Sequence, residues 1–304
     1  LISKTDGQGN TAYLGSVNTN SYVDKDVVNG SKYTYTVIAM NSLGESKVSD
    51  VSNTLYRWNE EIPAKPQLAV GGIKVTWEKK SFAQSYVLYR GVNNVWTPIA
   101  QTKEPTYLDE DVVNNTAYSY AVALVIDGSE STLFKPANQQ IKYVAPATDL
   151  VITNANRYIC LTWAEMEGAQ KYYVYKADTL NGEYKLIATT DANNRKIYDK
   201  DVAPGKIAYY SVKTDNGEAV SVLAPGKRNM YLDYPQLTGV VNEYTGQKIT
   251  WKAVTGATAY RVYRKVYGAK YYTYIATVDG NTLSYTDSGA VNGKMMCYTV
   301  RAAN

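Results

Sequence analysis

Pairs of aspartates spaced by two residues are the strongest candidates for chemistry in this chain. Three pairs occur: Asp24 with Asp26, Asp109 with Asp111, and Asp199 with Asp201. Residues two apart on an extended chain point to the same side, so each pair could bind calcium or supply the two carboxylates of a glycosidase. A fourth segment reads Asp287-Ser288-Gly289 and lacks the second carboxylate. This loss favours the alternative in which the first Asp accepts backbone hydrogen bonds in a turn, and we expect no metal site and no cofactor.

Other chemistry is excluded by residue type. The chain contains no histidine, which removes Ser-His triads and histidine-based metal sites. It has neither a Gly-rich phosphate loop nor a zinc pattern. Cys160 and Cys297 fall in different repeats, each on the outward side of its expected strand, so they form neither a disulfide framework nor a metal cluster. The chain is therefore predicted not to be an enzyme.

Tyrosine is the other unusual residue type, with 30 Tyr against 2 Phe among 304 residues. Exposed rings can stack on sugars or anchor a protein partner, but an outward Tyr can equally pack against its cross-strand neighbours. We expect packing to dominate, with Tyr263 and Tyr272 as exceptions and the segment 265–274 as the best candidate patch. The candidate binding residues are Tyr89, Tyr175, Tyr263, Tyr271 and Tyr272.

A repeat of about 85 to 90 residues must position these side chains. Each Asp segment precedes a Tyr-x-Val strand pattern. Trp77, Trp163 and Trp251 recur in the same register, each at the end of an alternating apolar run. Alternation predicts strands with one buried face, and no segment has a sustained helical period with caps. The sequence therefore predicts an all-β chain with these three indoles in its cores.

Taken as a set, these patterns resemble fibronectin type III modules, especially those of bacterial secreted and cell-surface proteins. The Trp-ended strand, the Tyr-x-Val-Tyr-Arg strand and the Tyr-x-Asp turn carry the resemblance, which covers essentially the whole chain. It implies tandem immunoglobulin-like β-sandwiches, each with seven strands in two sheets and the Trp on the second strand. It also favours an extracellular or cell-surface location.

The same resemblance implies a corner tyrosine on the sixth strand, whose hydroxyl bonds back to the preceding backbone. Tyr33 and Tyr118 occupy this position in the first two repeats. Ala208 and Met296 stand there in the last two, so those repeats must close the corner in another way.

The period and the prolines divide the chain into four ranges. Proline-containing segments at 59–66, 144–146 and 234–235 precede a new first strand, and such short, stiff joints predict a rod with limited bending. Three and a half units would reach on the order of 100 Å. If Leu1 aligns with Val262, the first range begins in its third strand. We therefore expect the chain to be a segment of a longer array of such units. The ranges are 1–58, a partial unit; 59–144 and 145–232, two complete units; and 233–304, a unit without its last strand.

Charge and hydropathy limit the partners. Lys plus Arg is 32 and Asp plus Glu is 28, and the excess is spread over the chain without a basic block, which argues against nucleic acid. No run of about eighteen apolar residues occurs, so no membrane span is expected.

Three functions stay open. The favoured one is a non-catalytic structural spacer that presents another domain within a large surface-attached or secreted bacterial protein. The second is adhesion, with outward tyrosines engaging a glycan or protein partner at the cell surface. In the third, the chain is the accessory part of an extracellular glycan-degrading enzyme.

Overall fold

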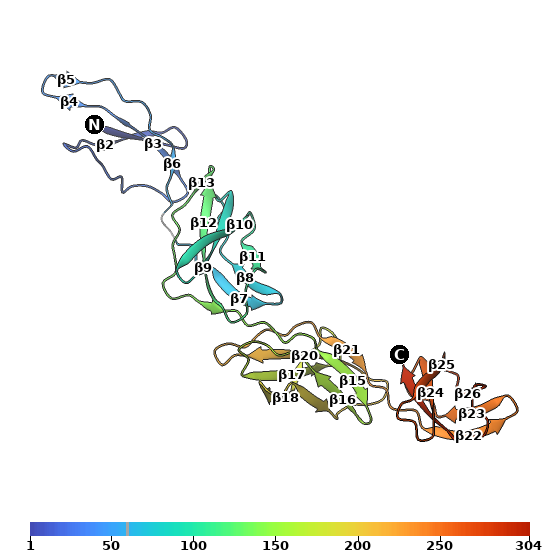
Figure 1. The fold of residues 1–304 in the computed structure, drawn as a ribbon. Helices are drawn as coiled ribbons and strands as arrows, with labels where there is room; N and C mark the ends of the chain where they lie inside the picture. Colours follow the sequence, from blue (N-terminus) through green and yellow to red (C-terminus); the bar gives the residue numbers. More distant parts are fainter. Residues whose placement is uncertain (59–60) are drawn as a thin grey trace. The chain divides into compact units, whose positions relative to one another are not determined.

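The computed structural model describes residues 1–58 and 61–304, so Asn59 and Glu60 of the first predicted joint lie outside the described residues. The described residues form strands β1 to β27 and no helix (Figure 1). Each sheet draws its strands from one of the four predicted ranges. The chain divides into two compact units, Leu1–Tyr143 and Val144–Asn304. The prediction of an all-β chain is confirmed.

The first range contains one larger sheet, in the order β2-β1-β3-β6, and the small hairpin β4-β5. Its described residues include no counterpart of the first two strands of a repeat. In the other ranges the fifth strand pairs only with the second strand. Residues 21–27, the counterpart of the fifth strand, have no such partner and do not form a strand. The strands are β1 (Ile2–Asp6), β2 (Thr11–Gly15), β3 (Lys32–Val37), β4 (Met40–Asn41), β5 (Gly44–Glu45) and β6 (Leu55–Tyr56).

Residues 61–143 form two sheets, seen as two layers in Figure 1. One has the order β11-β8-β7, and the other has the order β10-β9-β12-β13, with β14 also pairing with β12. The strands are β7 (Lys65–Ala69), β8 (Gly72–Thr76), β9 (Ser85–Val92), β10 (Val95–Thr102), β11 (Thr106–Asp109), β12 (Ala117–Ile126), β13 (Ser129–Glu130) and β14 (Ile141–Lys142).

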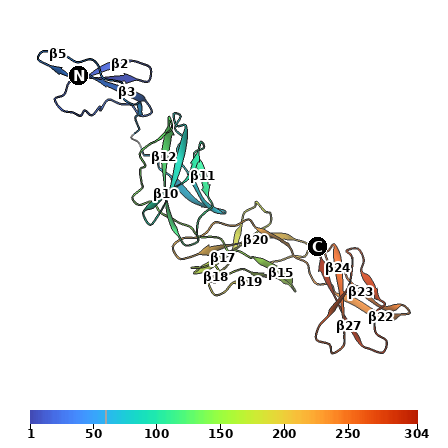
Figure 2. The ribbon, with the colours of Figure 1, turned by 45° about the horizontal axis from the view of Figure 1, so that its top comes forward.

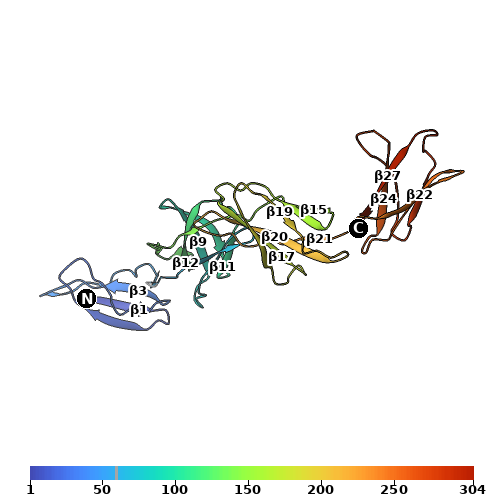
Figure 3. The same cartoon turned by 90° about the horizontal axis from the view of Figure 1, so that it is seen from below.

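Residues 144–232 repeat this plan (Figure 3), with one sheet in the order β15-β16-β19 and the other in the order β18-β17-β20-β21. The strands are β15 (Val151–Ala155), β16 (Tyr158–Thr162), β17 (Lys171–Ala177), β18 (Lys185–Asp191), β19 (Lys196–Asp199), β20 (Ile207–Asp215) and β21 (Lys227–Met230).

Residues 233–304 form the sheets β22-β23-β26 and β25-β24-β27 (Figure 2). The sixth strand of this range is β27. The strands are β22 (Leu237–Glu243), β23 (Gly246–Trp251), β24 (Ala259–Val266), β25 (Thr273–Asp279), β26 (Ser284–Asp287) and β27 (Met296–Ala303). The last three ranges thus share the two-sheet sandwich that the fibronectin type III resemblance implies, and this fold class is confirmed.

Each sandwich is built around one Trp–Tyr pair. Trp77, Trp163 and Trp251 are all buried, as predicted. Each indole packs edge-on against the first Tyr of the third strand, with ring centroids 5.5 to 5.6 Å apart. The same tyrosine closes the loop before its strand, since its hydroxyl accepts a backbone N–H six residues earlier; for Tyr172 the donor is Met166 at 2.9 Å. One aromatic pair therefore fixes both the core and a connecting loop.

The corner tyrosines behave as the resemblance implies. Tyr33 accepts a hydrogen bond from the backbone N–H of Val28 at 3.1 Å, and Tyr118 accepts one from Val113 at 2.8 Å. In the third range, where the corner position is Ala208, Tyr231 next to β21 accepts from the backbone N–H of Arg157 at 2.8 Å. This bond lies at a different turn from the missing corner.

Sheet register corrects one alignment. Ile2 pairs with Val37 as Val262 pairs with Val300, so Ile2, and not Leu1, is the counterpart of Val262. The expected alignment was wrong by one residue, because a repeat without its Trp-ended strand offers few markers. Burial agrees with the corrected register, since both Ile2 and Val262 are buried.

Candidate functional site

In the second and third ranges, the first aspartate of the pair lies in a buried ion pair between two sheets. Asp109 ends β11 in one sheet and is buried. Arg90 on β9 in the other sheet approaches it, with Nη1 3.0 Å from Oδ1. Tyr120 on β12 donates its hydroxyl to Oδ2 at 2.7 Å. The carboxylate therefore joins the third and sixth strands of one sheet to the end of the fifth strand in the other.

This Asp–cation–Tyr arrangement, which we call the lock, recurs in every range. The aspartate accepts from a Lys or Arg on the third strand at 2.7 to 3.0 Å and from a Tyr on the sixth strand at 2.6 to 3.0 Å. The Tyr always follows the Asp by eleven residues. The four locks are Lys4–Asp24–Tyr35, Arg90–Asp109–Tyr120, Lys176–Asp199–Tyr210 and Arg264–Asp287–Tyr298.

The second aspartate of each pair faces solvent. The Asp111 side chain is 93% exposed, whereas that of Asp109 is 3% exposed. Both carboxylates still contact Arg90, with Asp111 Oδ2 3.1 Å from Nη2, and the Asp111 carbonyl also accepts from Nη1. The two carboxylates share Arg90 but differ in exposure, so they do not point to the same side as the extended-chain pattern predicted. The strand ends at the first Asp, so extended-chain parity no longer applies to the second.

The fourth range shows how the second aspartate can be lost. Arg264 Nη1 reaches both oxygens of Asp287 at 2.7 and 2.9 Å. Gly289 stands where the other ranges have the second Asp, and a Cβ there would lie 2.7 Å from this guanidinium. The glycine leaves room for Arg264, so the first Asp alone holds the cation. The predicted turn bond is also present, since the Gly289 N–H donates to Asp287 Oδ1 at 3.0 Å.

The lock shifts the pKa of Asp24 and of the four lock tyrosines. Burial raises the pKa of Asp24, but the hydrogen bonds from Lys4 and Tyr35 outweigh this effect and hold it below the usual value. Burial, together with the bond to Asp24, raises the pKa of Tyr35 to about 12. Burial and the bonded carboxylate also raise the pKa of Tyr120, of Tyr210 and of Tyr298. Each lock tyrosine therefore stays a neutral hydroxyl donor at neutral pH.

The lock is a structural element. A buried carboxylate that already binds a protein cation and a hydroxyl has little capacity left for a metal ion or a substrate proton. Among residues 1–58 and 61–304, no group of three His, Cys, Asp or Glu side chains could hold a metal ion.

Sequence reasoning missed two of the three lock residues. The cation was readable, because Arg90, Lys176 and Arg264 each follow the outward Tyr of the third strand at the repeat period. The constant eleven-residue spacing from Asp to Tyr was a second signal. Neither stands out alone, since a cation near a strand end is usually a solvated side chain.

The three outward tyrosines of the third strands are half-buried, and each has a different neighbour. Tyr89 donates its hydroxyl to Glu130 at 2.7 Å. Lys213 lies over the Tyr175 ring at 5.5 Å. Tyr263 has Arg301 over its ring at 5.2 Å and Tyr274 edge-on at 5.8 Å. These rings therefore pack against cross-strand side chains.

The other two candidates lie on the hairpin between β24 and β25, and they are exposed. Tyr271 has 72% of its surface exposed and Tyr272 has 42%. Each carries a lysine ammonium over its ring, from Lys270 at 5.1 Å and from Lys265 at 4.9 Å. Lys265, which contacts the Tyr272 ring, lies two residues after Tyr263 on β24. Tyr89 and Tyr175 belong to other sheets.

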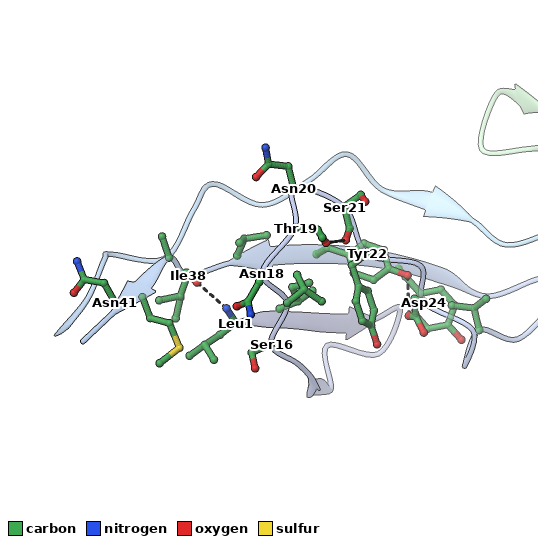
Figure 4. A pocket seen from close by; sticks show the side chains of 18 of the residues that line it. Leu1, Ser16, Asn18, Thr19, Asn20, Ser21, Tyr22, Asp24, Ile38 and Asn41 are labelled. Carbon is green, nitrogen blue, oxygen red and sulfur yellow. Dashed lines mark hydrogen bonds between the residues drawn. The ribbon is translucent and has the colours of Figure 1, made fainter. Parts of the chain in front are cut away.

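A cavity of about 1220 Å³ lies beside the larger sheet of the first range (Figure 4). Asn41 stands at one end, and Tyr22 and Asp24 stand at the other. Leu1 lies between them, and its amino group donates to the Ile38 carbonyl at 2.8 Å. This is the inner face of a sandwich without an opposing sheet in the described residues. Val37 is accordingly 49% exposed, whereas its counterpart Val122 is 3% exposed.

Comparison with known proteins finds no matching family model. A "Kelch domain-containing protein" of Sulfurisphaera tokodaii is 26% identical over 188 residues, which are 60% of this chain and 25% of that protein. The chain therefore spans about a quarter of the length of this relative.

Three solved structures with similar folds are of chicken proteins. The CNTN1 FN1–FN3 domains are 14% identical, with a TM-score of 0.33, and cover 80% of this chain and 92% of that one. The interferon gamma receptor alpha chain is 10% identical, with a TM-score of 0.32 and coverages of 56% and 98%. A two-domain fibronectin type III segment of tenascin is 11% identical, with a TM-score of 0.27 and coverages of 56% and 99%.

Proposed function

We propose that this chain is a spacer and presentation array, a non-catalytic series of β-sandwiches in a large secreted or surface-attached bacterial protein. The observation that carries the proposal is the fourfold recurrence of the lock. In the last three ranges, the carboxylates that could do chemistry instead tie the two sheets of the sandwich together, and in the first range Asp24 ties a loop to the sheet. Repeating one cross-link in every unit suits a protein whose task is to keep its shape under load.

The proposal also places this chain beside other domains. The Kelch domain-containing relative is about four times longer than the stretch that it shares with this chain. This supports a role as an accessory region that separates or presents another domain. A membrane anchor is not part of the proposal, and no helix in the described residues is long and apolar enough to span a membrane.

Small-angle X-ray scattering of the full chain tests the spacer role. A compact globule of 304 residues would have a radius of gyration of about 19 Å. We expect a clearly larger radius and a maximum dimension on the order of 100 Å, because the joints are short and contain proline. The matched control carries a flexible Gly-Ser segment inserted after Pro146, which should broaden the distance distribution. A radius near that of the compact globule would refute the proposal.

A further inference from the structure

The outer face of the sheet β25-β24-β27 differs from those of the other sandwiches. Its outward side chains on β24 alternate as Arg261, Tyr263 and Lys265, since Tyr260 and Val262 between them are buried. With Arg301 on β27 and the tyrosines of the adjoining hairpin, they form what we call the tyrosine face. Its members are Arg261, Tyr263, Lys265, Tyr271, Tyr272 and Arg301.

Two arginines of this face stand directly opposite each other. Arg261 pairs in register with Arg301, and like charges at such positions destabilise a sheet. Throughout residues 1–58 and 61–304, the ion pairs of the structure involve neither arginine, nor Lys265. Residues 259–278 contain four Lys or Arg and no Asp or Glu, and of these four Arg264 alone forms an ion pair within the described residues, with Asp287 in the lock. The face is therefore an uncompensated cationic surface.

The fold does not require these charges. The counterparts of the arginine pair are Tyr173 and Lys213 in the third range and Val87 and Ala123 in the second. In the third range a carboxylate reaches the same face, because Tyr173 donates to Asp215 at 2.8 Å. The Arg261–Arg301 pair destabilises its own sandwich, and the neighbouring sandwiches lack it. Such a feature points to a ligand.

The exposed rings and the cations are adjacent. Lysine ammonium groups lie about 5 Å from the ring centres of Tyr271 and Tyr272, at 5.1 and 4.9 Å. A single ligand monomer could therefore contact an aromatic ring and a cation together. A sugar ring with a carboxylate attached to it has this chemistry, because its C–H face stacks on tyrosine while the carboxylate pairs with the cation. In a nucleic acid, a sugar separates the base from the phosphate.

From this surface we propose that the tyrosine face binds an acidic polysaccharide, a glycan whose rings carry carboxylate groups. The binding does not depend on the spacer role, because a stiff array and a flexible one could both display the face. The cations supply attraction that weakens with salt, and the hairpin tyrosines supply contact with the sugar rings.

The test measures binding of the full chain to an oligogalacturonate of defined length by isothermal titration calorimetry. We expect saturable binding that weakens as salt increases. Binding should fall at least tenfold in Arg261→Thr with Arg301→Thr, and also in Tyr271→Ala with Tyr272→Ala. The melting temperature should stay unchanged in the tyrosine variant and should not fall in the arginine variant. Lys213→Thr in the third range is the matched control, and it should bind like the wild type.

Other probes separate the alternatives. A neutral glucan oligomer of equal length should bind at least tenfold more weakly. The proposal fails if oligogalacturonate does not bind, if the glucan binds equally well, or if Lys213→Thr loses as much affinity as the face variants. It also fails if single-stranded DNA or vesicles of phosphatidylserine and phosphatidylcholine bind more tightly than oligogalacturonate, since the face would then serve a nucleic acid or a membrane.

Discussion

The sandwiches of the second and fourth ranges share one strand plan, but their outer faces differ in exposure and charge. In the second range, Val87, Ala121 and Ala123 are buried. The Trp96 ring packs so closely on Gly91 that a Cβ at this glycine would lie 2.9 Å from the nearest ring atom. In the fourth, the position of Gly91 is Lys265, and the hairpin beyond it is exposed. The core and the lock are therefore common to the sandwiches, whereas the residues of the outer face differ between them and can serve a separate function.

The largest expected effect concerns what the sandwiches share. Replacing Trp77 or Trp251 with Ala should each lower the free energy of unfolding of its own sandwich by about 3–5 kcal/mol, because a large buried ring is removed. Hydrogen exchange with mass spectrometry on the full chain can locate the loss. An effect below about 1 kcal/mol, or one spread over the other ranges, would show that the Trp is not the centre of a core shared by these sandwiches.

The lock should come next. Asp109→Asn and Asp287→Asn should each cost about 1.5–3 kcal/mol, since a buried cation loses a charged hydrogen-bond acceptor. Asp111→Asn is the matched control, and its exposed side chain should contribute within about 0.5 kcal/mol. Hydrogen exchange at the third and sixth strands reports the change. Equal effects of Asp109→Asn and Asp111→Asn would show that the buried carboxylate is not the centre of the lock.

Alkaline pH should weaken the lock in every range. The pKa of tyrosine in the unfolded chain is about 10. A tyrosine whose pKa is raised by folding stabilises the fold fully below this value, and the contribution is lost as the pH rises through the folded pKa. For Tyr35 the loss should extend to about pH 12. Tyrosinate absorbance followed with circular dichroism should show late-ionising tyrosines that titrate together with unfolding. Complete ionisation at pH 10 with the β signal intact would contradict this expectation.

The corner tyrosine should matter less. Tyr118→Phe removes the acceptor of the Val113 N–H and should cost about 1 kcal/mol, measured by hydrogen exchange at the start of β12. The third range, with Ala208 at this position, already folds without the bond. A cost above about 3 kcal/mol would mean that the corner has a further role.

The smallest effect is expected from metals. Each first aspartate binds a protein cation, so calcium and a chelator should both leave the melting temperature unchanged. A rise with calcium that disappears in Asp109→Asn would show that the carboxylate binds metal in preference to Arg90.

Much of the fold was predictable because its signals are local. Alternation placed the Trp-ended strands, and the period placed their counterparts. The lock was not predicted, because it joins residues from three strands in two sheets, and sequence alone does not show which surface cation turns inward. The exposure of Tyr271 depends on the length of the β24–β25 hairpin and on its neighbours, which no single-strand pattern encodes. The register error at Leu1 arose where the repeat has no Trp-ended strand to count from.

The most direct test exchanges one outer face for another. Arg261→Tyr, Lys265→Ala and Arg301→Lys together give the fourth sandwich the third-range residues Tyr173, Ala177 and Lys213. Hydrogen exchange of this variant with and without oligogalacturonate measures amide protection in the core and on the tyrosine face in one experiment. We predict wild-type protection around Trp251 and no ligand-induced protection at residues 261–274, where the wild type gains protection. Loss of core protection, or ligand-induced protection equal to that of the wild type, would contradict the separation of core and face.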